Sequence, residues 1–142
     1  MGLRGTLLLV RTRELDAGQV AAWELEADAV AAGRARELVT EQLEAWGLDA
    51  LTFETELVVS ELVTNAVRYA EGPLQIRLIR DRTLLCEVAD TGHTSPHLRH
   101  STAEDEGGRG LFIVAQLVQR WGTRYTQSGK TIWTEQPLPT NE

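Results

Sequence analysis

The sequence predicts a single α/β domain, because helical and strand patterns both occur within its 142 residues. Two stretches, 31–46 and 57–70, carry apolar residues at the three- and four-residue spacing of a helix. Residues 74–90 alternate between apolar and polar side chains, as strands with one buried face do, and residues 121–135 read as a hairpin. A chain of this length is large enough for its own hydrophobic core.

The overall charge and the single cysteine narrow the class of protein. The net charge is −7, with 21 acidic against 14 basic residues, which argues against nucleic acid as a direct partner because phosphates favour basic surfaces. Cys86 is the only cysteine, so no disulfide framework is possible and a reducing compartment fits. No apolar run approaches the length of a membrane span, and the N-terminus lacks a signal-peptide layout. We therefore expect a cytoplasmic protein without a membrane segment.

Three regions are expected along the chain. Residues 1–20 contain a short apolar run, 3–10, and a polar stretch with a glycine, which predicts a leading strand and a linker. Residues 21–136 carry the periodic patterns of the folded domain. Residues 137–142, which begin with two closely spaced prolines, are expected to be a frayed tail.

Start and stop signals bound the two long helices. Asp28 is a good N-cap for the first helix, and Gly47 stands where its C-terminal stop is expected. Thr52 can cap the second helix, which Gly72 and Pro73 end. A weak alternating signal at 23–26 predicts a strand before the first helix.

The second helix holds the first candidate site. It is apolar on nearly every side, which is typical of a buried helix, yet it includes Glu61 and Asn65. Positions four apart are about 40° apart around a helix axis, so both side chains point the same way. One interpretation places Glu61 in water at the helix edge and bonds Asn65 to a nearby backbone group. The other is that the pair faces a bound metal–phosphate group, since an unpartnered buried charge is expensive.

A second carboxylate ends the inward face of a strand. Leu84, Cys86 and Val88 share one face of the strand 83–90, and Asp90 has the same parity. Cys86 is interpreted as a small buried hydrophobic residue.

A long irregular segment, 93–106, follows Asp90-Thr91-Gly92 and leads to the glycine cluster 107–110, which directly precedes an expected helix at 111–120. A loop of this length in a small domain is usually functional or mobile. Glycines before a helix let a phosphate approach free backbone N–H groups, and Arg109 adds a cation with bidentate geometry. A flexible hinge is the alternative interpretation.

These pieces, in this order, resemble the N, G1 and G2 boxes of the GHKL (Bergerat-fold, histidine-kinase-like) ATPases. The stretch S-E-L-V-T-N-A-V-R-Y-A, followed by G-R-G-L-F-I-V and then W-G, is most similar to the anti-sigma factor serine kinases. The resemblance covers about two-thirds of the chain. It implies a two-layer α/β sandwich with a mixed, mostly antiparallel sheet and helices on one face.

The resemblance also implies a role for each motif residue. Glu61 would be the base that removes the proton from a partner's serine, and Asn65 would be a ligand of Mg²⁺. Asp90 would accept a hydrogen bond from the adenine amino group, and residues 93–106 would form a lid. Thr94 stands where the G1 box usually has a second glycine, so the sequence departs from the family pattern at the start of this lid. The nucleotide-contacting residues implied are Asn65, Asp90, Gly92, Gly108, Arg109, Gly110 and Leu111.

The function implied is that of an Mg-ATP-dependent serine/threonine protein kinase. It would phosphorylate an anti-anti-sigma partner of the STAS type and sequester a sigma factor. An ATP-binding interaction module without phosphotransfer is the alternative, and the presence of Glu61 favours the kinase. Relatives are commonly dimers, so a homodimer is possible. Residues 5–13 resemble the last strand of metal-dependent phosphatase domains, which implies a longer multidomain regulator.

Three rival motifs are weaker. Asp90-Thr91-Gly92 also matches half of an aspartic protease site, but that interpretation leaves the apolar helix without a role and puts a histidine where alanine or serine is usual. Residues 129–131 mimic the end of a P-loop, but a strand follows instead of a helix. His93, His97 and His100 lie close together without any cysteine, so exposed loop histidines are favoured over a zinc site.

Overall fold

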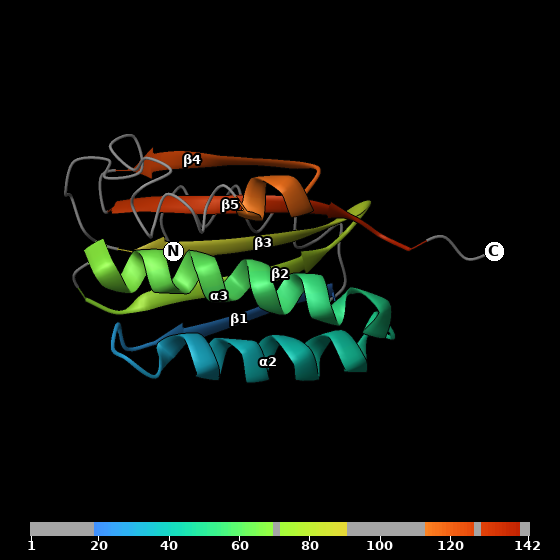
Figure 1. The fold of residues 1–142 in the computed structure, drawn as a ribbon, viewed down its shortest axis with the longest axis horizontal. Coiled ribbons are helices and arrows are strands. Elements are labelled where there is room, and N and C mark those ends of the chain that lie inside the picture. The colour runs from blue at the N-terminus through green and yellow to red at the C-terminus, as the bar shows by residue number, and fades with distance from the viewer. Residues whose placement is uncertain (1–18, 70–71, 91–112, 127–128, 140–142) are drawn as a thin grey trace.

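The structure, a computed structural model, describes residues 19–69, 72–90, 113–126 and 129–139. The described residues form two layers, a twisted sheet and a layer of helices (Figure 1). Three stretches for which the sequence makes predictions lie outside this part of the chain. They are 1–18, expected as a leading strand and linker, 91–112, expected as a lid and glycine cluster, and 140–142, the end of the expected tail.

Five strands form an open sheet in the order β1-β2-β3-β5-β4. All four pairings within it are antiparallel. The strands are β1 (Val20–Leu25), β2 (Leu74–Arg80), β3 (Thr83–Asp90), β4 (Arg120–Thr126) and β5 (Gly129–Pro137). The strands expected at 74–80 and 83–90 and the hairpin at 121–135 are confirmed. The strand expected at 23–26 is present as β1, but it begins three residues earlier and ends at Leu25. β5 follows β4 along the chain but lies between β4 and β3.

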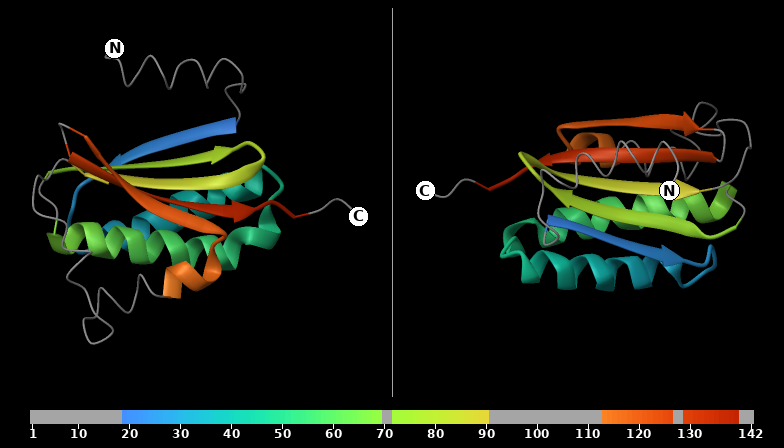
Figure 2. Two further views of the ribbon diagram at one scale, coloured as in Figure 1. Left: turned by 90° about the horizontal axis from the view of Figure 1, so that it is seen from above. Right: turned by 180° about the vertical axis from the view of Figure 1, so that it is seen from behind.

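The helices of the described residues lie on one face of this sheet, as Figure 2 shows in the view from above. They are α2 (Ala31–Ala45), a 3-10 helix (Asp49–Leu51), α3 (Thr52–Tyr69) and a short helical segment at 113–117. The predicted two-layer α/β sandwich with helices on one face is therefore confirmed. Within the described residues, no helix combines the length and the apolar character needed to cross a membrane.

The ends of α2 show which local signals decide helix boundaries. Gly47 adopts φ +72°, and its N–H donates to the Glu44 carbonyl at 3.0 Å. The N–H of Leu48 donates to the Leu43 carbonyl at 2.8 Å, which completes a Schellman motif at the predicted stop. The helix begins two residues later than the Asp28 cap implied. The Asp28 carboxylate accepts from the N–H of Val30 at 3.1 Å, within the turn before the helix.

Two other predicted helix limits are wrong. Thr52 is itself helical, with φ −59° and ψ −48°, because the 3-10 helix runs directly into α3 and leaves no non-helical residue to cap it. The helix expected at 111–120 is shorter at its C-terminal end, since the described helical segment stops at 117 and β4 begins at Arg120.

Pro137 still belongs to β5, and Leu138 packs against the core, so the first two residues of the expected tail are part of the fold.

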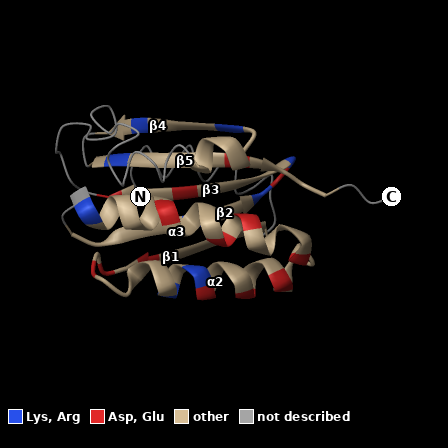
Figure 3. Cartoon of the chain, in the orientation of Figure 1, with Lys and Arg blue, Asp and Glu red and all other residues tan. Residues whose placement is uncertain are grey.

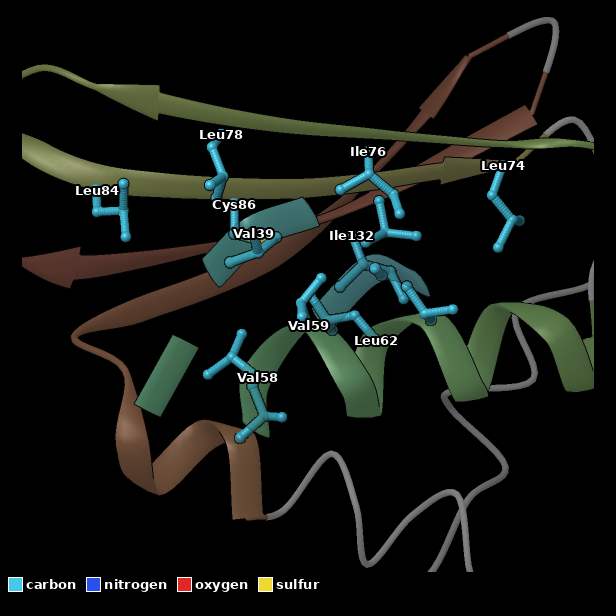
Figure 4. Close-up of a cluster of buried hydrophobic side chains, with 14 of the residues drawn as sticks. Val39, Val58, Val59, Leu62, Leu74, Ile76, Leu78, Leu84, Cys86 and Ile132 are labelled. Carbon is cyan, nitrogen blue, oxygen red and sulfur yellow. The ribbon is translucent and has the colours of Figure 1, made fainter. Parts of the chain in front are cut away.

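The core lies between the helices and the sheet, and Figure 4 shows its centre. Fully burying a Val, Leu or Ile side chain contributes about 1.5–3 kcal/mol, so the α3 side chains here are a large share of the stability. Alternation along β2 and β3 supplies the opposite wall. The fully buried apolar residues at the interface of α3 with the sheet include Val58, Val59, Leu62, Val63, Leu74, Ile76, Leu78, Leu84 and Cys86.

On the other face of the sheet, one carboxylate joins three strands. Glu87 on β3 accepts from Arg77 on β2 at 3.0 Å and from Arg124 on the edge strand β4 at 3.1 Å. The exposed acids of α2 lie on the opposite side of the molecule, along the outer surface of the helical layer (Figure 3).

Candidate nucleotide-binding site

Three elements that carry candidate residues end at the same side of the molecule. The C-terminal end of α3, the C-terminal end of β3 and the beginning of β5 lie at one end of the two-layer sandwich in every view (Figures 1 and 2). Asn65 lies one turn before the end of α3, and Asp90 is the last residue of β3. The fold thus brings the helix pair and the strand carboxylate, predicted from separate patterns, to one end.

Asn65 is buried, with 2% of its surface exposed. Neither its Oδ1 nor its Nδ2 atom finds a hydrogen-bond partner among the described residues. The structure thus rules out, within that part of the chain, the interpretation in which Asn65 bonds a backbone group. A buried amide without partners is destabilising by about 1–3 kcal/mol, so the side chain is suited to meet a ligand oxygen or a metal ion.

Glu61 precedes Asn65 by one helical turn and lies on the same flank of α3. Glu61 is half-buried, whereas its helix neighbours Val58 and Leu62 are fully buried. The carboxylate therefore stands at the margin of the core, where solvent or a second protein can reach it. This position agrees with the prediction that Glu61 lies at the helix edge, and it leaves a catalytic role open.

Polar contacts at the far end and along the side of α3 hold the helix in register with the sheet. The Nε2 atom of Gln136 on β5 donates to the Thr55 hydroxyl at 3.2 Å, and both side chains are fully buried. On the opposite flank, Arg36 of α2 donates to the Ser60 hydroxyl at 2.9 Å. Because α3 is fixed at these points and through its apolar face, Glu61 and Asn65 are presented from a rigid element, as a binding site requires.

Asp90 is also buried, with 7% of its surface exposed. Its neighbour across the strand pair is Lys130 on β5. Val88 and Ile132 form the next pair on the same face of these two strands, and both are buried in the core. Asp90 and Lys130 are therefore on the face of the sheet that the helices cover. The predicted inward orientation of Asp90 is therefore confirmed, and Lys130 occupies the neighbouring position on the same face of the sheet.

Lys130 is a residue beside Asp90 that the sequence patterns did not assign to the candidate site. In the sequence it belongs only to the P-loop-like stretch 129–131. Its strand partner, Asp90, lies about 40 positions earlier, and such a pairing cannot be predicted from neighbouring residues. Its inward parity with Ile132 and Thr134, in a strand that is otherwise short of charge on that face, was the available signal.

Cys86 belongs to the core and not to the site. Burial, together with the neighbouring Glu87 carboxylate, raises the pKa of the Cys86 thiol from 9.0 to about 12. A thiol with such a pKa stays protonated at neutral pH and is a poor nucleophile. The prediction of a buried hydrophobic role for Cys86 is confirmed.

The other predicted site residues lie outside the described part of the chain. They are Gly92, Gly108, Arg109, Gly110 and Leu111, together with Thr94 and the three histidines. Among the described residues, no group of three or more His, Cys, Asp or Glu side chains could hold a metal ion by itself.

Comparison with known families decides the class. Residues 25–135 match the family model of the histidine kinase-like ATPase domain. The chain belongs to the histidine kinase-like ATPase family. The resemblance of its N and G boxes to this superfamily is thus confirmed, and the match spans every described element from the end of β1 to β5.

Among solved structures, the ATPase domain is similar to the RsbU and RsbW domains of Rv1364c from Mycobacterium tuberculosis. The TM-score is 0.61 and the identity 23%, over 84% of this chain and 32% of that one. This likeness shows the fold, and the chain spans about a third of the length of that protein. A search of curated protein sequences gave no match.

Proposed function

We propose that this ATPase domain binds Mg·ATP and transfers the γ-phosphoryl group to a serine or threonine of a protein partner. Family membership implies that the nucleotide is ATP. The observation that carries the proposal is the buried amide of Asn65, which has no partner among the described residues and lies one turn from a solvent-accessible Glu61 on the helix that bears the family's N-box pattern. A site that keeps an unsatisfied amide in its core without a ligand is difficult to explain by stability alone.

Each described residue has a role suited to its position. The Oδ1 atom of Asn65 would be a ligand of the Mg²⁺ ion, which neutralises phosphate charge during transfer. Asp90, which can only accept hydrogen bonds when ionised, would receive the 6-amino group of adenine. Glu61, at the margin of the core, would accept the proton of the attacking hydroxyl group, since a general base must reach a substrate that arrives from outside.

The partner we propose is an anti-anti-sigma protein of the STAS type, and the domain itself would sequester a sigma factor. Support comes from the motif resemblance and from the similar fold of a structure that contains an RsbW domain. Residues 93–106 would cover the nucleotide, and the phosphates would meet the backbone of 108–110.

Two measurements test the proposal in sequence. Isothermal titration with Mg·ATP should show saturable binding that is lost in Asn65→Ala. Incubation with γ-labelled ATP and a candidate STAS partner should then label the partner. Glu61→Gln should retain nucleotide binding and lose at least about a hundredfold in transfer rate, because general base catalysis typically contributes that much.

Glu54→Gln is the matched control for the base. Glu54 lies two turns earlier on the same flank of α3 and is exposed, so its loss should leave the transfer rate unchanged. Binding of Mg·ATP without any transfer to the partner that the domain captures would instead support the alternative function, an ATP-dependent interaction module. Absence of nucleotide binding would contradict both.

A further inference from the structure

Lys130 is the only lysine of the chain, and it is buried. Just 5% of its surface is exposed, at the beginning of β5 and at the end of the sheet where α3 and β3 also end (Figure 1). Strand parity puts it on the helix-facing side with Ile132, and the pairing register puts it directly beside Asp90. Side chains in such a cross-strand pair have Cβ atoms about 4.5–5.5 Å apart.

The surroundings of Lys130 do not explain why an ammonium group is buried there. Burying a charge is unfavourable unless it is paired and hydrogen-bonded. Within the described residues, no ion pair or side-chain hydrogen bond holds Lys130, whereas Glu87, another buried charge of the sheet, is bound by two arginines. Among the described residues, Lys130 therefore keeps free donor capacity, at the same end of the sandwich as the amide of Asn65, which also lacks a partner there.

A carboxylate and an ammonium group carried by two cross-strand neighbours match the edge of adenine. The 6-amino group of adenine donates hydrogen bonds, and the ring nitrogens on either side of it, N1 and N7, accept them. Asp90 offers only acceptors and Lys130 only donors. The spacing of a cross-strand pair is of the same order as the separation of neighbouring polar groups on a base edge.

We propose that Lys130 is a nucleotide-specificity residue, whose ammonium group donates to a ring nitrogen next to the 6-amino group that Asp90 accepts. This inference rests on the proposed binding of ATP. The base would then be recognised through two hydrogen bonds, one to Asp90 and one to Lys130. Guanine presents an acceptor, O6, where adenine presents its amino group, and the Asp90 carboxylate would repel O6. A site with one donor and one acceptor rejects a base that lacks either partner more strongly than an apolar pocket can.

Deaza analogues test the contact directly. Dissociation constants are measured by isothermal titration for ATP, 1-deaza-ATP and 7-deaza-ATP, each with Mg²⁺, on the wild-type chain and on Lys130→Met. The wild type should bind one of the two analogues about tenfold or more weakly than ATP, since a hydrogen bond to a charged donor is lost. Lys130→Met should bind ATP weakly by a similar factor and should no longer distinguish that analogue from ATP.

Thr131→Val is the matched control, because Thr131 is the next residue of β5 and lies on the opposite face of the sheet. It should keep the wild-type dissociation constants for all three nucleotides. Thermal unfolding confirms that each variant is folded, and Lys130→Gln, which keeps a polar side chain of similar size, repeats the comparison if the Met variant does not fold.

The outcomes separate this inference from the function on which it rests. Equal binding of all three nucleotides by the wild type would overturn the role of Lys130, as would an unchanged affinity of Lys130→Met for ATP. If Asp90→Asn weakens ATP binding while Lys130→Met affects only thermal stability, Lys130 is merely a structural neighbour of Asp90. Failure of the wild type to bind Mg·ATP would instead overturn the proposed function.

Discussion

Replacing Asn65 by leucine should make the nucleotide-free domain more stable. Leucine has the same number of side-chain heavy atoms and the same branch point as asparagine, so it occupies nearly the same space between α3 and the sheet. In the wild type, two buried amide atoms have no partner among the described residues. Removing such a group relieves a penalty of about 1–3 kcal/mol, and the buried methyl groups add further apolar contact.

The assay is urea unfolding of the nucleotide-free protein, followed by far-ultraviolet circular dichroism. With a urea dependence of about 2 kcal/mol per molar, a gain of about 2 kcal/mol raises the midpoint by about 1 M. Saturation with Mg·ATP at a hundred times its dissociation constant should stabilise the wild type by about 2.7 kcal/mol and leave Asn65→Leu unchanged, so that the advantage of the variant disappears. The loss of function would then accompany a gain in stability.

Thr64→Leu is the control, because it places the same side chain at the adjacent, exposed position of α3. Its stability should stay within about 0.5 kcal/mol of the wild type, and its affinity for Mg·ATP should not change. A nucleotide-free Asn65→Leu protein that is less stable than the wild type by more than 1 kcal/mol would refute the reasoning about the unpartnered amide. Full retention of Mg·ATP binding by that variant would refute the ligand assignment.

Three further predictions concern other parts of the fold. Cys86→Ala should reduce the loss of stability in alkali. The pKa of the Cys86 thiol rises from 9.0 to about 12 on folding, so its contribution to stability is complete below pH 9 and is lost as the pH rises above 9. Between pH 8 and pH 10, the free energy of unfolding should therefore fall by about 1.4 kcal/mol more in the wild type than in the variant. Gly122→Ala should cost about 1–3 kcal/mol in urea unfolding, because a Cβ atom there would lie 2.8 Å from Cζ2 of Trp133, and Gly33→Ala, which meets nothing closer than 3.6 Å, should not. Leu62→Ala should cost about 2–5 kcal/mol, with a smaller loss indicating that α3 does not bury this side chain against the sheet.

Features encoded by neighbouring residues could be predicted from the sequence. The spacing of Glu61 and Asn65, the inward parity of Asp90 and the stop at Gly47 each depend on a few adjacent positions, and the structure agrees with all of them. The strand sequences and the hairpin are local in the same sense. These features suffice to assign the family, because its boxes are themselves short motifs.

Features that depend on distant residues were missed or shifted. The cap assigned to Thr52 failed because the packing of Leu51 stabilises a 3-10 helix that continues into α3. The insertion of β5 between β3 and β4 has no local signature, since strand order is set by burial across the whole sheet. The pairing of Lys130 with Asp90 follows only from that order, so this part of the site required the structure.

The position of β5 has a consequence for the biosynthesis of the domain. β5 comes after β4 along the chain, yet it separates β4 from β3. A nascent polypeptide that has left the ribosome only as far as β4 has an unpaired β3 edge and no neighbour for β4. Cooperative folding must therefore wait for Gly129–Pro137, and with them for the lysine beside Asp90. Chains terminated before this strand should be targets for chaperones and proteases, and no partly made domain should compete with the finished one for nucleotide.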